Sequence, residues 1–162
     1  MNGTIGNHRG DATRIAVLGQ SLGGVTVIAL TRKNCCRDDR VRASILVDAL
    51  TTFGGSFGSD PITAGPPTLI MHGTADATVA ISSSVTLYNS IAPPRFFLGI
   101  LGAGHSDAVE SQADPPIHAR DSAERATIAF LNAQFRGDGA GLAQTLSALQ
   151  AEGDTAMSDP TP

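Results

Sequence analysis

Aromatic residues are scarce in this sequence, which has no tryptophan, one tyrosine and six phenylalanines among its 162 residues. The core must therefore be built mainly from aliphatic side chains. Hydrophobic residues make up 41% of the chain and charged residues only 16%. This composition predicts a chain that is mostly globular rather than disordered, and its length fits one domain.

Positive charge is also in short supply, because 11 Lys and Arg stand against 15 Asp and Glu, for a formal net charge of −4. Without a basic patch that could hold phosphates, nucleic acid is not an expected partner. The sequence has no apolar run of about 18 residues and no secretory signal. We therefore expect a cytoplasmic protein that does not engage a membrane.

Cysteine occurs only twice, as the neighbours Cys35 and Cys36. Adjacent cysteines rarely bridge each other, because the geometry of such a bond is strained. Two neighbouring residues also cannot build a disulfide framework or a zinc site. We expect a pair of free thiols and no metal.

Short apolar runs alternate with helical stretches along the chain. Strands are expected at residues 14–18, within 42–50, at 68–73 and at 95–101, and helices at 22–33, 82–91 and 115–135. This alternation predicts an α/β fold with about four parallel strands, joined by right-handed crossovers.

The chain divides into three parts. Residues 1–13 form a leading segment, 14–136 the α/β core, and 137–162 a tail whose composition shifts towards Ala, Gly and Asp. In the tail, Leu142, Leu146 and Leu149 fall on one face of a short predicted helix. Roughly the last dozen residues are expected to be disordered.

The stretch "LGQSLGG", residues 18–24, places Ser21 between Gly19 and Gly23. It follows a predicted strand and opens a predicted helix, which is the setting of a nucleophile elbow. Such a turn forces the serine into a strained backbone conformation, so the residues two positions away must lack side chains. The pattern predicts that Ser21 is a nucleophile.

A serine hydroxyl needs a base to become a good nucleophile. Of the four histidines, His72 and His105 follow predicted strands, at the carboxyl edge where function collects in parallel sheets. The small residues 102–104 leave His105 free to lean towards the serine, so we predict that it is the base. His72 comes directly out of its strand and is expected to pack or hydrogen-bond locally.

A carboxylate must orient the imidazole and stabilise its protonated form. Asp76 follows the third predicted strand, and Asp48 ends the second one. Either could reach His105. Asp76 is favoured because its turn lies near the loop that carries His105, and Asp48 remains the alternative acid.

Three stretches together resemble the α/β-hydrolase family, over roughly residues 11–135: "RIAVLGQSLGG", "PTLIMHGTADATVAISSSVTLYNSI" and "LGAGH". Their order of serine, aspartate and histidine is the family's order. The resemblance is to the esterase branch that contains dienelactone-hydrolase-like, chlorophyllase-like and cutinase-like polyester hydrolases. It implies that Ser21 is the nucleophile, His105 the base and acid, and Asp76 its partner. It also implies that the backbone N–H of Leu22 is an oxyanion donor and that no cofactor is used.

The chain departs from this family before the elbow. The family has several strands there and a loop that carries a second oxyanion donor, whereas "MNGTIGNHRG" offers no substitute. A family member truncated in this way would leave strand 14–18 without a neighbour on one side. We therefore expect a homo-oligomer, completed by pairing of two 14–18 strands across a two-fold axis, or cover from the leucines of the tail.

The function expected from the sequence is that of a serine carboxylesterase, which hydrolyses short-chain acyl esters through an acyl-enzyme. The Gly-rich segment 51–67 would border the acyl pocket, with Phe53 and Phe57 as its apolar contacts. The alternative is a non-catalytic or very weakly active binding or assembly module that keeps the fold.

Overall fold

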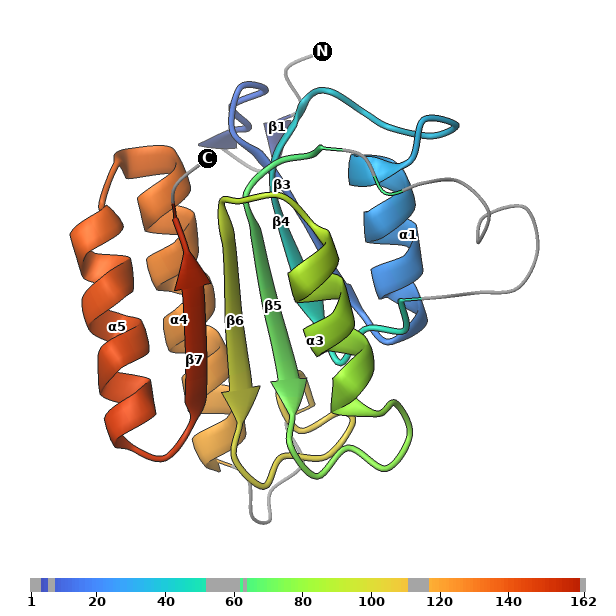
Figure 1. Ribbon diagram of the computed structural model, residues 1–162. Helices are drawn as coiled ribbons and strands as arrows, with labels where there is room; N and C mark the ends of the chain where they lie inside the picture. Colours follow the sequence, from blue (N-terminus) through green and yellow to red (C-terminus); the bar gives the residue numbers. More distant parts are fainter. Residues whose placement is uncertain (1–3, 6–7, 52–61, 63, 111–116, 161–162) are drawn as a thin grey trace.

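The structure is a computed structural model that describes residues 4–5, 8–51, 62, 64–110 and 117–160. Its centre is a sheet of strand order β3-β4-β5-β6-β7, with helices on both faces (Figure 1). Four strands are parallel and the fifth is antiparallel to its neighbour: β3 (Ile15–Gln20), β4 (Val41–Val47), β5 (Thr68–Gly73), β6 (Arg95–Ile100) and β7 (Thr155–Asp159). The predicted α/β class is confirmed.

The helices form two layers around the sheet. On one face lie α1 (Leu22–Arg32) and α3 (Ile81–Ser90), and on the other lies α4 (Ile117–Arg136). The helix of the tail, α5 (Gly139–Ala151), packs against α4 and β7. A separate antiparallel pair, β1 (Thr4–Ile5) and β2 (His8–Arg9), precedes the main sheet. Among the described residues, no helix has the length and apolar character needed to cross a bilayer.

The core is largely aliphatic, as the composition requires. All six residues of β5 are buried, because α3 covers one face of the strand and α4 the other. A strand covered on both faces accounts for the continuous apolar run in "TLIM". Aromatic rings add to this core, as where Phe96 and Phe130 meet edge to face with their ring centroids 5.8 Å apart.

The end of the chain differs from the prediction of disorder, which is wrong for Thr155–Asp159. This segment pairs with the outer edge of β6. It is anchored by the buried Asp154, whose carboxylate accepts the N–H of Leu101 at 2.9 Å and contacts His118 Nε2 at 3.1 Å. The predicted apolar face of the tail helix is confirmed, because it is buried against the chain's own core through Leu142, Leu146 and Leu149. The expectation that these leucines of the same chain cover the open edge of strand 14–18 is wrong, because α5 packs against α4 and β7, and β7 is at the opposite edge of the sheet from β3.

The two cysteines also differ from the prediction, because Cys35 and Cys36 form a disulfide with each other. They lie in the turn that follows α1. The expectation of free thiols depended on the rarity of such neighbours, and here the local turn brings the two sulfur atoms together. The pair is far from the carboxyl ends of the parallel strands, at the opposite end of α1.

The strand β3 is an edge strand, since among the described strands it pairs only with β4. Leu18, near its centre, is 52% exposed. An apolar edge of this kind favours pairing with another chain. Self-association through residues 14–18 therefore stays a prediction, and the geometry of β3 motivates it.

We expect the purified protein to have twice the mass of one chain in sedimentation or light-scattering measurements, because two β3 edges can pair across a two-fold axis. Leu18→Lys should shift the protein to a monomer, since an edge lysine opposes such pairing. Ser147→Lys, at an exposed position on α5, is the matched control and should stay dimeric. A well-folded wild-type monomer would contradict this prediction.

Candidate active site

Ser21 lies at the sharp turn between β3 and α1, in the position predicted for a nucleophile. Its φ of 53° and ψ of −121° form a conformation that residues with side chains seldom adopt. Three backbone hydrogen bonds hold it there. The N–H of Ser21 donates to the carbonyl of Val47 at 2.9 Å, and the carbonyl of Ser21 accepts from Gly24 and Leu50, both at 3.0 Å.

The glycines around Ser21 have unequal roles. A Cβ on Gly19 would overlap the carbonyl group of Gly23, so the close approach of strand and helix excludes a side chain at position 19. At Gly23, however, a Cβ would meet open space. The expectation that both neighbours must be glycine is thus correct for Gly19 and wrong for Gly23. The second position that excludes a side chain is Gly24, where a Cβ would overlap Ala49 on the adjacent segment.

The structure brings Ser21, His105 and Asp76 together in one hydrogen-bonded chain. His105 Nε2 lies 2.8 Å from Ser21 Oγ, and His105 Nδ1 lies 2.7 Å from Asp76 Oδ2. An ionised carboxylate only accepts hydrogen bonds. Nδ1 therefore carries the proton donated to Asp76, and Nε2 is left to accept the hydroxyl proton of Ser21. This is the arrangement that a general base needs.

Asp76 is held by both of its oxygen atoms. Oδ2 binds His105, while Oδ1 accepts the backbone N–H groups of Thr78 at 2.7 Å and Val79 at 2.9 Å. Burial by itself raises the pKa of this carboxyl. The hydrogen bonds from His105, Val79 and Thr78 outweigh burial and hold the pKa below its ordinary value. Asp76 is consequently ionised at neutral pH, as a partner of an imidazolium must be.

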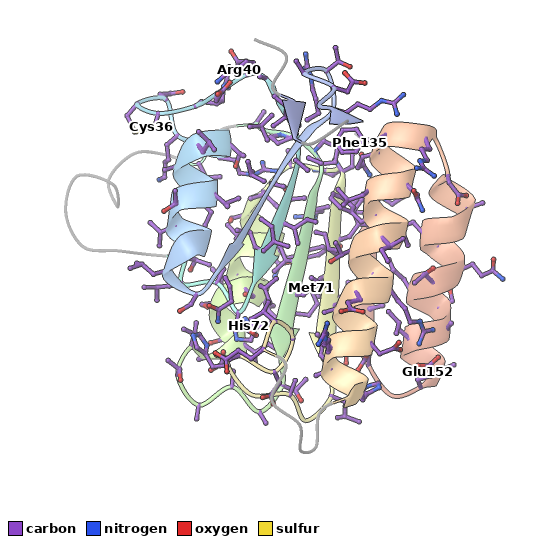
Figure 2. All side chains as sticks on the ribbon, turned by 180° about the vertical axis from the view of Figure 1, so that it is seen from behind. Cys36, Arg40, Met71, His72, Phe135 and Glu152 are labelled. Carbon is purple, nitrogen blue, oxygen red and sulfur yellow. A yellow bond between two sulfur atoms is a disulfide. The ribbon has the colours of Figure 1, made fainter. Side chains whose placement is uncertain are left out.

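His72 supports the turn that carries Asp76. Its side chain is fully buried, with Nδ1 2.8 Å from Ser84 Oγ and Nε2 2.9 Å from the carbonyl of Val79. A carbonyl only accepts, so Nε2 carries the proton and Nδ1 accepts from the Ser84 hydroxyl. The prediction that His72 hydrogen-bonds locally is confirmed. Figure 2 shows His72 with its neighbour Met71 near the end of the sheet where the parallel strands finish.

Asp48, the alternative acid, lies close to this group but has another role. It is fully buried with a positive φ of 45°, and its Oδ1 accepts the N–H of Gly73 at 2.8 Å. Among the described residues its Oδ2 has no hydrogen-bond partner. Asp48 thus ties the end of β4 to the end of β5, while Asp76 takes the contact with His105.

The side chains of Asp48, His72 and Asp76 also approach one another as metal ligands would, with one ligand atom of each within 4.8 Å of the others. However, both ring nitrogens of His72 already have partners, and Asp76 is engaged by His105 and by backbone N–H groups. Asp48 Oδ2 is the one atom of this group without a partner among the described residues, which is fewer free donor atoms than a metal site requires.

The pH dependence of stability should change when Asp48 is replaced by asparagine. Burial raises the pKa of Asp48 from 3.8 to about 6. The folded protein therefore holds this proton more tightly than the unfolded chain does, and the wild type loses stability as the pH rises from about 4 to about 6. Asp48→Asn cannot ionise and escapes this loss, which is on the order of 2 to 3 kcal/mol. Thermal denaturation should show that the stability of the variant relative to the wild type increases between these pH values. Above them the difference in stability should stay constant. A difference independent of pH would contradict the prediction.

Gln20 is a site residue that the sequence analysis missed. Its Nε2 donates to the backbone carbonyl of His105 at 2.9 Å, so the residue before the nucleophile fixes the loop that carries the base. The same loop is stabilised by Asp107, which accepts the N–H of Gly104 at 2.7 Å. The one available signal was the place of Gln20 beside Ser21, which does not disclose a contact 85 residues away along the chain.

The remaining predicted site residues divide into two groups. Leu22 opens α1 directly after Ser21, so its N–H belongs to the first turn, whose N–H groups have no partner within the helix. That placement agrees with the expected oxyanion donor. Phe53 and Phe57 lie outside the described residues.

The described part of the chain is therefore an α/β fold with a Ser–His–Asp hydrogen-bonded chain at the carboxyl edge of its parallel strands. No protein-family model matches this sequence, and a comparison with curated proteins finds no match.

Proposed function

We propose that this protein is a serine carboxylesterase of the α/β-hydrolase family that hydrolyses short-chain acyl esters. The observation that carries the proposal is the continuous hydrogen-bonded chain from Ser21 Oγ through His105 to Asp76, with contacts of 2.8 and 2.7 Å. A nucleophile, a base and an orienting carboxylate in this geometry are what acyl transfer requires.

In the first half of the reaction, Ser21 Oγ bonds to the carbonyl carbon of the ester while His105 Nε2 takes its proton. The positive charge that forms on His105 is stabilised by the ionised Asp76, whose low pKa keeps it charged. The tetrahedral intermediate then breaks its bond to the alcohol oxygen, and His105 returns the proton to that oxygen. This leaves the acyl group on Ser21.

In the second half, His105 takes a proton from water, and the water oxygen attacks the acyl carbon. The acid leaves as the bond to Ser21 Oγ breaks and His105 reprotonates the serine. The negative charge of both tetrahedral intermediates lies beside the N–H of Leu22 at the start of α1, where the helix dipole also favours it. A site with one donor in place of two works about a hundred- to a thousand-fold more slowly.

The test is hydrolysis of p-nitrophenyl butyrate, measured in the wild type and in Ser21→Ala. The wild type should release a first burst of p-nitrophenol equal to the enzyme concentration, because the acyl-enzyme forms and accumulates. Ser21→Ala should show neither the burst nor turnover. Ser147→Ala, an exposed serine on α5, is the control and should behave as the wild type. Equal rates in the wild type and Ser21→Ala would refute the proposal.

A further inference from the structure

An apolar groove of about 240 Å³ lies between β3 and α4, on the face of the sheet opposite α1 and α3. Figure 2 views this face, with Met71 between β3 and α4. The buried Val47 and Met71 form its floor, and Leu18 of β3 and Ile128 of α4 flank it. Ala108 and Val109, from the loop after His105, lie at one end. We infer that this groove binds the acyl chain of the ester, an inference that rests on the proposed function.

The groove is built from the segments that position the nucleophile and the base. Val47, in its floor, accepts the N–H of Ser21 through its carbonyl and stands opposite Gln20 in the sheet. Val109, at its end, belongs to the turn after His105, where its N–H donates to the carbonyl of Ser106 at 3.0 Å. The groove therefore borders both the strand that leads to Ser21 and the loop that carries His105.

The lining determines the chemistry of the occupant. Three of its side chains are large, apolar and still in contact with water, since Leu18, Val109 and Ile128 are 52%, 46% and 61% exposed. Among the described residues of the lining, the one with a charge is Glu124, whose carboxylate pairs with Arg120 at 2.8 Å. A neutral hydrocarbon chain fits this surface, whereas a chain that ends in a carboxylate would meet no positively charged side chain among the described residues of the lining.

The size of the groove limits the chain length. Its volume of about 240 Å³ is several times the roughly 30 Å³ that one water molecule occupies in the liquid. This volume accommodates an acyl chain from butanoyl to octanoyl. Each methylene that leaves water should raise kcat/KM by about fourfold. In an open groove, which buries only part of the chain, we expect hexanoate esters to be preferred over acetate esters by about tenfold or more.

The first experiment measures kcat/KM for p-nitrophenyl acetate, butyrate, hexanoate and octanoate. The wild-type values should rise from acetate to hexanoate. Thr127→Trp places a large ring in the groove and should lower the ratio of hexanoate to acetate towards one. Gln144→Trp, the same ring on an exposed position of α5, should keep the wild-type ratio. A flat wild-type profile, or a rise that survives in Thr127→Trp, would overturn the inference.

The second experiment does not depend on turnover. Ser21→Ala with ¹³C-labelled methyl groups is titrated with methyl hexanoate and, separately, with methyl acetate. Methyl hexanoate should shift the NMR signals of Leu18, Val109 and Ile128, and methyl acetate should leave them in place. If the chemical shifts of these methyl groups do not change with the ester but do change with protein concentration, the groove binds a second copy of the chain. That result would overturn the inference. Binding in the groove without any hydrolysis by the wild type would instead refute the esterase.

Discussion

A protein in which His105 is replaced by alanine should hydrolyse p-nitrophenyl butyrate about 10⁴-fold more slowly than the wild type, or slower still. His105 is the side chain that contacts both Ser21 and Asp76 in the structure. Without it, the serine has no base and the leaving alcohol has no acid. The ratio of kcat/KM values for the two proteins measures the effect.

The matched control is His118→Ala. This histidine lies on α4, its side chain is 40% exposed, and its partner is Asp154. Because His118 takes no part in the Ser–His–Asp chain, the variant should keep activity close to that of the wild type. Turnover by His105→Ala at the wild-type rate would rule out the assigned base.

The second large effect concerns the glycines of the elbow. Gly19→Ala should lower the free energy of unfolding by about 3 kcal/mol or more, since its Cβ would overlap backbone atoms of Gly23 that cannot move without displacing α1. Gly23→Ala introduces the same methyl group into open space. It should change stability by about 1 kcal/mol or less, towards greater stability, because alanine is the better helix former.

Urea denaturation of the three proteins measures this contrast. The two variants add the same methyl group at positions four residues apart. A general effect of removing glycine would therefore change the free energy of unfolding of both variants equally. Equal losses at the two positions would contradict the close contact of β3 and α1 at Gly19. A loss confined to Gly23→Ala would contradict it more strongly.

Local patterns were sufficient to predict most of the sheet and its covering helices. Apolar runs such as "TLIMHG" are buried on both faces, and a proline or glycine stands close to most of the boundaries between elements. β7 could not be predicted in this way. The sequence "TAMSD" lacks a strand pattern, and it becomes a strand because the outer edge of β6 and the anchor at Asp154 are already in place.

The same division applies to the site. The order of Ser21, Asp76 and His105, each after a predicted strand, was sufficient to predict that they meet, since parallel strands end at one edge of a sheet. The sequence favoured Asp76 over Asp48 as the partner of His105, and the structure has that contact. The hydrogen bonds from Thr78 and Val79 that hold Asp76 in place depend on the local turn and were not predicted. The contact of Gln20 with the His105 carbonyl also depends on tertiary packing.

A fluorophosphonate reagent tests whether Ser21 is an activated nucleophile. Such a reagent bonds covalently to a serine that a neighbouring base activates. Mass spectrometry of the intact wild type should show one adduct per chain, and peptide mapping should place it on Ser21. Ser21→Ala should remain unmodified. A folded wild-type protein that acquires no adduct would contradict the account and favour a non-catalytic binding or assembly module with this fold.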